Sequence, residues 1–423
     1  MALVAYHHAY PVACVEWFLS LVLSAAASLR CAGQAIKVTV TVLGLSLECP
    51  SWSAGRLWLL RLGYYKLMRP KVHADDWVLI MDHTVQVGKE KCLVILGIRL
   101  CDLPPVGDCL SHEAVEPIEL VPVEQSNGEV VYQQLEQAVA KIGGVPRAIV
   151  SDHGTDLKAG IDKFCQRHPQ TSSIYDIKHK TAAVLKHELE QDADWLAFTQ
   201  WANQTGRRVQ QTALAALTPP NQKTKARYMN LEELVQWGQA MLALLDQPPT
   251  QVKLSLDPEQ VQEKLGGITS FRSQLEEWGE LLEIITTAES FVRHHGLYAD
   301  AHRELKTQLR GRAHTQRTRR VRDELVAFVA VEETKARPGE RLLGSSEIIE
   351  SVLGKMKRLE QDQAKSGFTG LILGLSAMVS TTTREVIQKA LETVPTKQVL
   401  AWCRETLGRS VQAKRREVLA LLG

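Results

Sequence analysis

The chain has 423 residues, a length that allows two or three domains with hydrophobic cores of their own. Its formal net charge is only +2, so nucleic-acid binding cannot be inferred from the total charge and must come from local basic patches. The eight cysteines form no C-x-x-C pair and no metal-binding spacing, which predicts free thiols in a reducing, cytoplasmic setting.

The apolar segment 12–29 is the one stretch that resembles a signal peptide or a membrane span. No Lys or Arg precedes it, and Glu16 lies inside it. A signal peptide carries a positively charged region before its apolar part, and a membrane span rarely contains an acid. We therefore predict a packed helix here and no association with a membrane.

Residues 1–75 are predicted to form a helical N-terminal module. A helix capped by Ser53 would direct apolar residues inward and arginines outward. The inward residues are Leu57, Leu60 and Leu62, and the outward ones are Arg56 and Arg61. A short helix, a turn marked by Pro50 and a basic second helix fit a DNA-binding helix-turn-helix or a plain helical bundle, and the sequence leaves both open.

The next part of the chain, residues 76–180, alternates apolar runs with turn residues. Unbroken runs of Val, Ile and Leu are typical of buried strands, and a Gly-Lys turn at 88–89 predicts a hairpin between the first two. The predicted elements are strands 77–82, 91–100 and 118–123, a helix 129–142, a strand 148–151, a helix 156–166 and a strand 172–176. Three strands, a helix, a strand, a helix and a strand is the succession of the ribonuclease-H-like fold.

Strand patterns end after His179. Residues 181–336 are helical in pattern, with Pro-Pro breaks at 219–220 and 248–249, and are predicted to form an all-helical insertion domain. Residues 337–423 would complete the ribonuclease-H-like core, with a helix capped at Ser345-Ser346 and a helical tail. The predicted class is α/β, with a mixed five-stranded sheet, an all-α insertion domain and a helical N-terminal module.

Three carboxylates are candidates for a metal site. Asp82 and Asp152 each lie at the C-terminal end of a predicted strand. Glu350 lies on the helix after the insertion, where Glu347 is an alternative third ligand. A buried carboxylate needs compensation, and three of them can hold two divalent ions about 4 Å apart. Mg²⁺ prefers oxygen ligands, so we expect two Mg²⁺ ions, with Mn²⁺ able to substitute.

Motifs around these acids carry a resemblance to a known family. They are Met-Asp-His-Thr at 81–84, Val-Ser-Asp-His-Gly-Thr-Asp-Leu at 150–157 and Ile-Glu-Ser at 349–351. Lys357 follows Glu350 by seven positions, which is about two helical turns and places both side chains on one helix face. The chain resembles DDE transposases, and the glutamate–lysine spacing is similar to that of insertion-sequence enzymes. The resemblance implies that Lys357 contacts DNA phosphate.

Asp176 and His179 resemble the C/D-x-x-H motif of hAT and Mutator-like transposases, which also carry a helical insertion. The resemblance implies that both support the site, with His179 either a metal ligand or a residue that packs behind the ligands. Asp156 is expected to cap its helix. The Y-x2-R-x3-E pattern of one insertion-sequence subgroup is absent, because Leu343 and Ser346 stand in its places.

A basic stripe is predicted within the insertion, interrupted at Gly311. Its members follow helical spacings and are Arg303, Lys306, Arg310, Arg317 and Arg320. The stripe is either a solvated charged face or a phosphate contact. The insertion tryptophans Trp195, Trp201 and Trp278 are expected in the core, with base stacking as the alternative.

The resemblance implies a mobile-element transposase that uses magnesium to cleave double-stranded DNA at transposon ends and joins the ends to target DNA. It further implies a dimer or higher homo-oligomer in the cytoplasm, associated with the nucleoid. Two alternatives stay open: a nuclease of the same fold without joining activity, and a catalytically inactive, transposase-derived DNA-binding protein.

Overall fold

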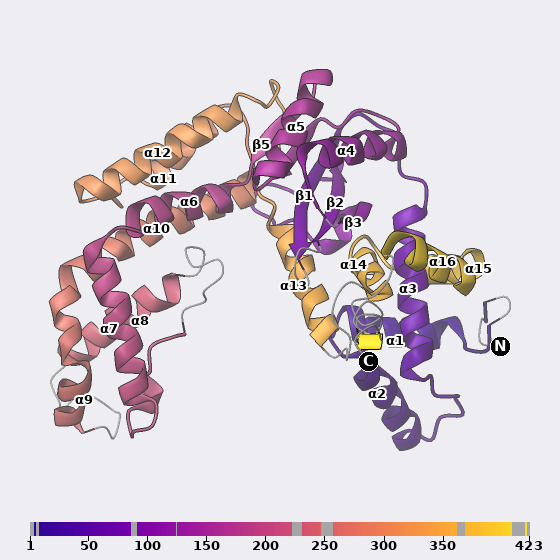
Figure 1. Cartoon of the computed structure of the whole chain (residues 1–423), viewed down its shortest axis with the longest axis horizontal. Coiled ribbons are helices and arrows are strands. Elements are labelled where there is room, and N and C mark those ends of the chain that lie inside the picture. The colour runs from indigo at the N-terminus through magenta and orange to yellow at the C-terminus, as the bar shows by residue number, and fades with distance from the viewer. Residues whose placement is uncertain are drawn as a thin grey trace. The chain divides into compact units, whose positions relative to one another are not determined.

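The computed structural model describes residues 4–5, 8–85, 91–123, 125–221, 231–246, 257–361, 369–407 and 419–420. The chain divides into two compact units (Figure 1). The first unit comprises Met1–Ile174 and Ser345–Gly423, and the second comprises Tyr175–Gly344. The N-terminal helices and the sheet therefore belong to one unit, although a separate module over 1–75 was predicted.

The described part of the first unit contains a five-stranded mixed sheet in the order β3-β2-β1-β4-β5. Its strands are β1 Trp77–Val85, β2 Lys91–Arg99, β3 Glu116–Val123, β4 Ala148–Ser151 and β5 Ser172–Tyr175. β1 pairs antiparallel with β2 and parallel with β4, and β2 pairs antiparallel with β3. The predicted α/β class and mixed five-stranded sheet are confirmed, whereas the turn predicted at 88–89 lies outside the described residues.

One face of the sheet is covered by α4 (Gly128–Ile142) and α5 (Thr155–Arg167). Alternate residues of β1, including Leu79 and Met81, join these helices in a buried cluster. The helices pack closely because a Cβ at Gly160 would overlap the side chain of Val131. Helix α13 (Glu347–Gln361) contacts β1 and contributes no residue to that cluster, which places it at the other face.

The remaining described helices of the first unit form a group with α3 at its centre. They are α1 Val12–Leu23, α2 Leu29–Val42, α3 Trp52–Met68, α14 Leu373–Ala377, α15 Arg384–Thr393 and α16 Thr396–Leu407. Helix α1 buries Val12, Val15 and Phe18, so the predicted packed helix is confirmed. Among the described residues, no helix combines the length and the apolar character needed to cross a membrane.

Helix α3 is buried around most of its circumference and contacts α2, α14 and α15. The prediction that Arg61 faces outward is wrong: this side chain is 9% exposed and its guanidinium donates to the carbonyl of Leu391. A recognition helix must offer a face to the DNA groove. The burial of α3 therefore favours the helical-bundle alternative over the helix-turn-helix.

The described part of the second unit is helical apart from the last residue of β5 and an isolated bridge between Leu297 and Leu342. Its α-helices are α6 Ile177–Leu189, α7 Ala193–Val209, α8 Glu232–Asp246, α9 Pro258–Leu265, α10 Arg272–His295, α11 Ala301–Gln308 and α12 Gln316–Glu333. Trp195 and Trp278 are buried and meet edge to face, with ring centroids 4.9 Å apart. Their predicted place in the core is confirmed, and half-buried Trp201 packs beside Phe198.

Short 3₁₀ helices connect these elements. They span Leu100–Asp102, His112–Ala114, Ala215–Leu217, Gly266–Phe271 and Gly370–Ile372. All eight cysteines are free, as predicted from their spacing.

Candidate metal-binding site

Asp82 lies in β1, and Asp152 directly follows β4, the neighbouring parallel strand, which ends at Ser151. Ile80 pairs with Val150 and Met81 with Ser151, so the next residues in register are Asp82 and Asp152. Neighbouring strands are about 4.8 Å apart, and side chains two positions apart share a face. Since Met81 faces α4 and α5, Asp82 faces the other side, where α13 contacts β1.

Backbone donors fix the orientation of both carboxylates. The N–H of His83 donates to Oδ1 of Asp82 at 2.6 Å, and the N–H of Gly154 donates to Oδ1 of Asp152 at 2.8 Å. Both side chains are half-buried. β1 continues three residues past Asp82 because its ladder with β2 extends to Val85. Asp82 therefore lies within the strand, although the sequence predicted that it ends the strand.

Glu350 is half-buried in the first turn of α13, together with Glu347. Ser345, one of the two predicted capping residues, accepts the N–H of Glu347 through its Oγ at 3.2 Å. The buried face of α13, with Ile349 and Val352, packs the helix against its unit. Helix α13, which carries Glu350, contacts β1, which carries Asp82. β1 in turn pairs with β4, the strand that precedes Asp152.

The three acids do not surround a single ion. Ligand atoms of one Mg²⁺ lie about 2.1 Å from it, and so at most about 4.2 Å from one another. In the described part of the chain, Asp82, Asp152 and Glu350 do not form a set whose ligand atoms all lie within 4.8 Å of one another. Such acids can serve a site of two ions, in which each ion is held by a subset of them.

Asp176 and His179 form a pair at the start of α6. Asp176 is fully buried and caps the helix, accepting the N–H of His179 at 3.1 Å. Its Oδ2 also lies 2.7 Å from Nδ1 of the His179 ring, an arrangement that presents Nε2 of the imidazole for other contacts. Asp176 and His179, two residues that the sequence motifs had singled out, each offer an atom that could bind a metal ion.

Asp156 does not cap α5, contrary to the prediction. The N-cap is Gly154, which makes no side-chain capping bond, and Asp156 lies in the first turn. Burial opposes ionisation of Asp156, but Ser126 and the charges of His83 and Lys91 outweigh it and lower its pKa. His83 follows Asp82 in β1 and so points to the opposite face of the sheet, which places Asp156 away from the Asp82 side.

The predicted basic stripe of the second unit is not continuous. Residues 309–315, with Gly311 at φ +79°, separate α11 from α12. Arg317 is 18% exposed and pairs with Glu188, Asp192 and Glu277, and Arg320 also pairs with Glu188. The stripe prediction is wrong because these two arginines hold α12 to α6 and α7.

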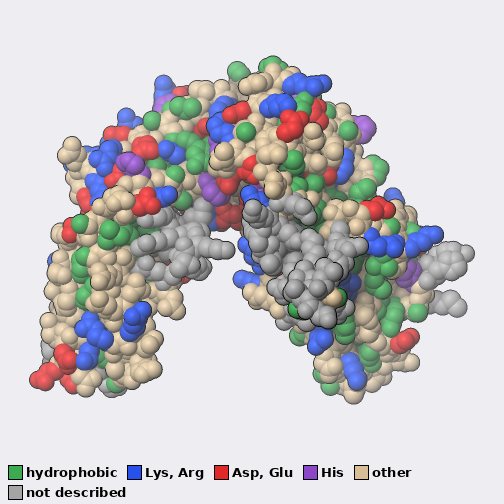
Figure 2. Space-filling model, in the orientation of Figure 1, with side chains coloured by type: hydrophobic (Ala, Val, Ile, Leu, Met, Phe, Trp, Pro, Cys, Tyr) green, Lys and Arg blue, Asp and Glu red, His purple; other side chains and the backbone are tan. Residues whose placement is uncertain are grey.

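Other predicted DNA contacts lie on the surface. Arg303, Lys306 and Arg310 are exposed on and after α11, and Lys357 is exposed on α13, while Arg56 is half-buried on α3. Arg303 pairs with Asp300 at 3.2 Å. On the face in Figure 2, basic and acidic side chains are interspersed and form no single patch.

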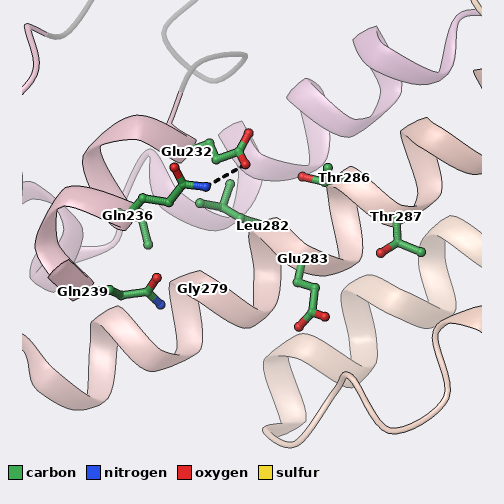
Figure 3. A pocket seen from close by; sticks show the side chains of 9 residues that line it. Glu232, Gln236, Gln239, Gly279, Leu282, Glu283, Thr286 and Thr287 are labelled. Atoms are coloured by element: carbon green, nitrogen blue, oxygen red, sulfur yellow. Dashed lines mark hydrogen bonds between the residues drawn. The ribbon is translucent and has the colours of Figure 1, made fainter. Parts of the chain in front are cut away.

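A cavity in the second unit lies between α8 and α10 (Figure 3). It has a volume of about 280 Å³ and a polar lining of glutamates, glutamines and threonines. The amide of Gln236 donates to Glu232 at 2.9 Å across its rim. The carboxylates of Glu232 and Glu283 would repel a phosphate, so this cavity is not an anion site.

The sequence analysis did not identify two cations on the helix that carries Glu350. Lys355 and Arg358 lie on α13 beside Lys357 and line a cavity, whereas Lys357 does not. The glutamate–lysine spacing pointed to Lys357 alone. The loop 24–28 on the other side of this cavity is more than 320 positions away in the sequence, and no local pattern joins the two.

No family model matches the chain, and no curated protein matches it.

Proposed function

We propose that this protein is a DDE transposase with a ribonuclease-H-like core. The observation that carries the proposal is the parallel register of β1 and β4, which puts Asp82 and Asp152 at the same level of two neighbouring strands. Helix α13, which bears Glu350, contacts β1. A strand order of β3-β2-β1-β4-β5, with an antiparallel meander followed by a parallel crossover, supports the assigned fold. The helical unit between β5 and α13 corresponds to the insertion.

The donor set supports magnesium as the metal. Asp82, Asp152 and Glu350 offer only carboxylate oxygens, and their half-buried positions leave room for the waters that Mg²⁺ retains. Mn²⁺ should substitute, because it accepts the same oxygen ligands. The bound metal would lower the pKa of an attacking water and balance charge on the phosphate.

The three carboxylates would act by holding the metal in a fixed orientation. Asp82 and Asp152 are kept in place by backbone donors, and Glu350 is carried by a helix whose buried face fixes its rotation. None of the three needs to exchange a proton. Within the second unit, Asp176 would orient the imidazole of His179 through its bond to Nδ1.

The partner would be double-stranded DNA, first at the element ends and then at the target. Arg303, Lys306, Arg310 and Lys357 are exposed cations that would contact phosphate. Because two ends must be held together for joining, the working form would be a dimer or a higher assembly.

The test uses the purified full chain and a plasmid that carries the DNA flanking its reading frame. With Mg²⁺ we expect cleavage at element ends and covalently joined products, and with EDTA neither. Asp82→Asn should lose both activities and still bind DNA. Cleavage without joining would assign a nuclease, and binding without any cleavage would assign an inactive DNA-binding descendant.

A further inference from the structure

A small cavity in the first unit lies between the loop that joins α1 to α2 and the end of α13. Its volume is about 80 Å³, more than the roughly 30 Å³ that one water molecule occupies. The floor is apolar, with Val22, Leu359 and Met378, and the polar lining consists of Ser24, Ser28, Lys355 and Arg358. In this described lining there are two cations and no acid.

The two cations retain donors for a ligand. Lys355 donates to Nδ1 of His112 at 3.0 Å, which uses one of its three N–H groups. Arg358 is exposed and forms no ion pair with the residues that the structure describes. Arg317 in the second unit is held by three acids, whereas the guanidinium of Arg358 keeps its donors for an anion.

The cavity lining also includes Ser28, the residue that precedes α2. Ser28 caps this 14-residue helix, and its Oγ accepts the N–H of Cys31 at 3.2 Å. The first N–H groups of a helix lack partners within it and favour negative charge. They reinforce the two cations, which remain the main reason for expecting an anion.

We propose that this cavity binds one phosphate of the DNA backbone. The proposal rests on the proposed function, and it adds a contact on α13, the helix that carries Glu350. Held there, DNA would lie along the exposed side of α13. A Cβ added at Gly354 on this helix would have no neighbour within 4 Å. The contact would be independent of base sequence, because phosphates carry no sequence information.

The test measures binding of the full chain to a mixed-sequence 30-base-pair duplex at several salt concentrations. Arg358→Gln removes a cation, and Ser28→Asp places a carboxylate in the cavity while keeping a good N-cap. Ser51→Asp is the matched control, because Ser51 caps α3 in the same unit and does not line the cavity. Loss of one phosphate contact lowers the slope of log K against log salt by about 0.9.

We expect weaker DNA binding and a lower salt slope for Arg358→Gln and Ser28→Asp, and no change for Ser51→Asp. Unchanged binding in both cavity variants would overturn the proposal. A second arm titrates inorganic phosphate against thermal stability. If Ser28→Asp abolished stabilisation by phosphate but left DNA binding intact, the ligand would be a free phosphate, and the DNA assignment would be wrong. The cleavage assay with Asp82→Asn tests the proposed function separately.

Discussion

Lys66 is a fully buried lysine at the centre of the first unit. Its Nζ lies within hydrogen-bond distance of four acceptors, which its three N–H groups share. They are the carbonyls of Ala377, Val379 and Ser380 at 3.2, 2.7 and 2.8 Å and Oγ1 of Thr382 at 2.5 Å. Ser380 has φ +55°, a strained conformation for a residue other than glycine. The ammonium therefore holds an irregular turn against α3 and satisfies carbonyls that would otherwise be buried without donors.

Replacing Lys66 by methionine should lower the free energy of unfolding of the first unit by about 3 kcal/mol. Methionine has a similar length and volume but no donor, and each buried carbonyl left without one costs about 1–3 kcal/mol. Hydrogen exchange of the β1 and β4 amides would measure the change. Lys357→Met, on the exposed face of α13, is the control and should shift the free energy by less than about 0.5 kcal/mol.

The same lysine should make stability depend on pH. Burial and the nearby Arg69 charge lower the pKa of Lys66 to about 7, although Glu116 opposes the shift. The unfolded side chain titrates near 10.4, so between about pH 7 and 10 the unfolded state binds more protons and stability rises with pH. Lys66→Met should flatten this rise in denaturation experiments. An equal slope in the two proteins would assign the pH dependence to other groups.

At the scale of elements, two glycines in helices of the first unit have opposite roles. A Cβ at Gly63 of α3 would overlap the backbone carbonyl of Leu373 in α14, whereas a Cβ at Gly354 of α13 would meet nothing within 4 Å. Gly63 permits close helix packing, and Gly354 only lowers helix propensity.

We therefore expect Gly63→Ala to destabilise the first unit by about 1–3 kcal/mol through overpacking. Gly354→Ala should stabilise it by about 0.5–1 kcal/mol, because alanine favours the helix more than glycine does. Urea denaturation of both variants measures whether each substitution lowers or raises the free energy of unfolding. Equal destabilisation by both would mean that α13 is packed on its Gly354 side.

The strands and helices of the sheet region were predictable because their signals are local. β4, at Ala148–Ser151, begins and ends as predicted, and α4 begins one residue before the predicted start. The burial of α3 could not be predicted in this way. Arg61 finds its acceptor 330 positions away in Leu391, and Lys66 finds its acceptors more than 310 positions away.

The candidate site shows the same division between local and distant information. Strand endings singled out Asp82 and Asp152, and the family resemblance added Glu350 and Asp176. Only the β1–β4 register shows that the first two lie at the same level of neighbouring strands. The basic stripe failed for the opposite reason. The direction of Arg317 depends on a turn at Gly311 and on three acids that are distant in the sequence. Helical periodicity predicts neither the turn nor these ion pairs.

At the scale of the whole molecule, the second unit has the features of an autonomous domain. Its two ends meet, since the N–H of Ile177 donates to the carbonyl of Gly344 at 3.1 Å. Its core contains Trp195, Trp278 and Phe198, all almost fully buried. A domain with its own core and adjacent ends is suited to insertion into another fold.

Residues 175–344 should therefore fold as an isolated protein with a cooperative thermal transition and a near-ultraviolet spectrum from packed tryptophans. Trp195→Ala should destabilise it by about 3–5 kcal/mol, because it removes a buried aromatic side chain. Leu196→Ala is the matched control, since that neighbouring side chain is 44% exposed. A fragment that gave helical circular dichroism without a cooperative transition would contradict autonomy, because it would show that the tryptophan core needs the first unit to pack.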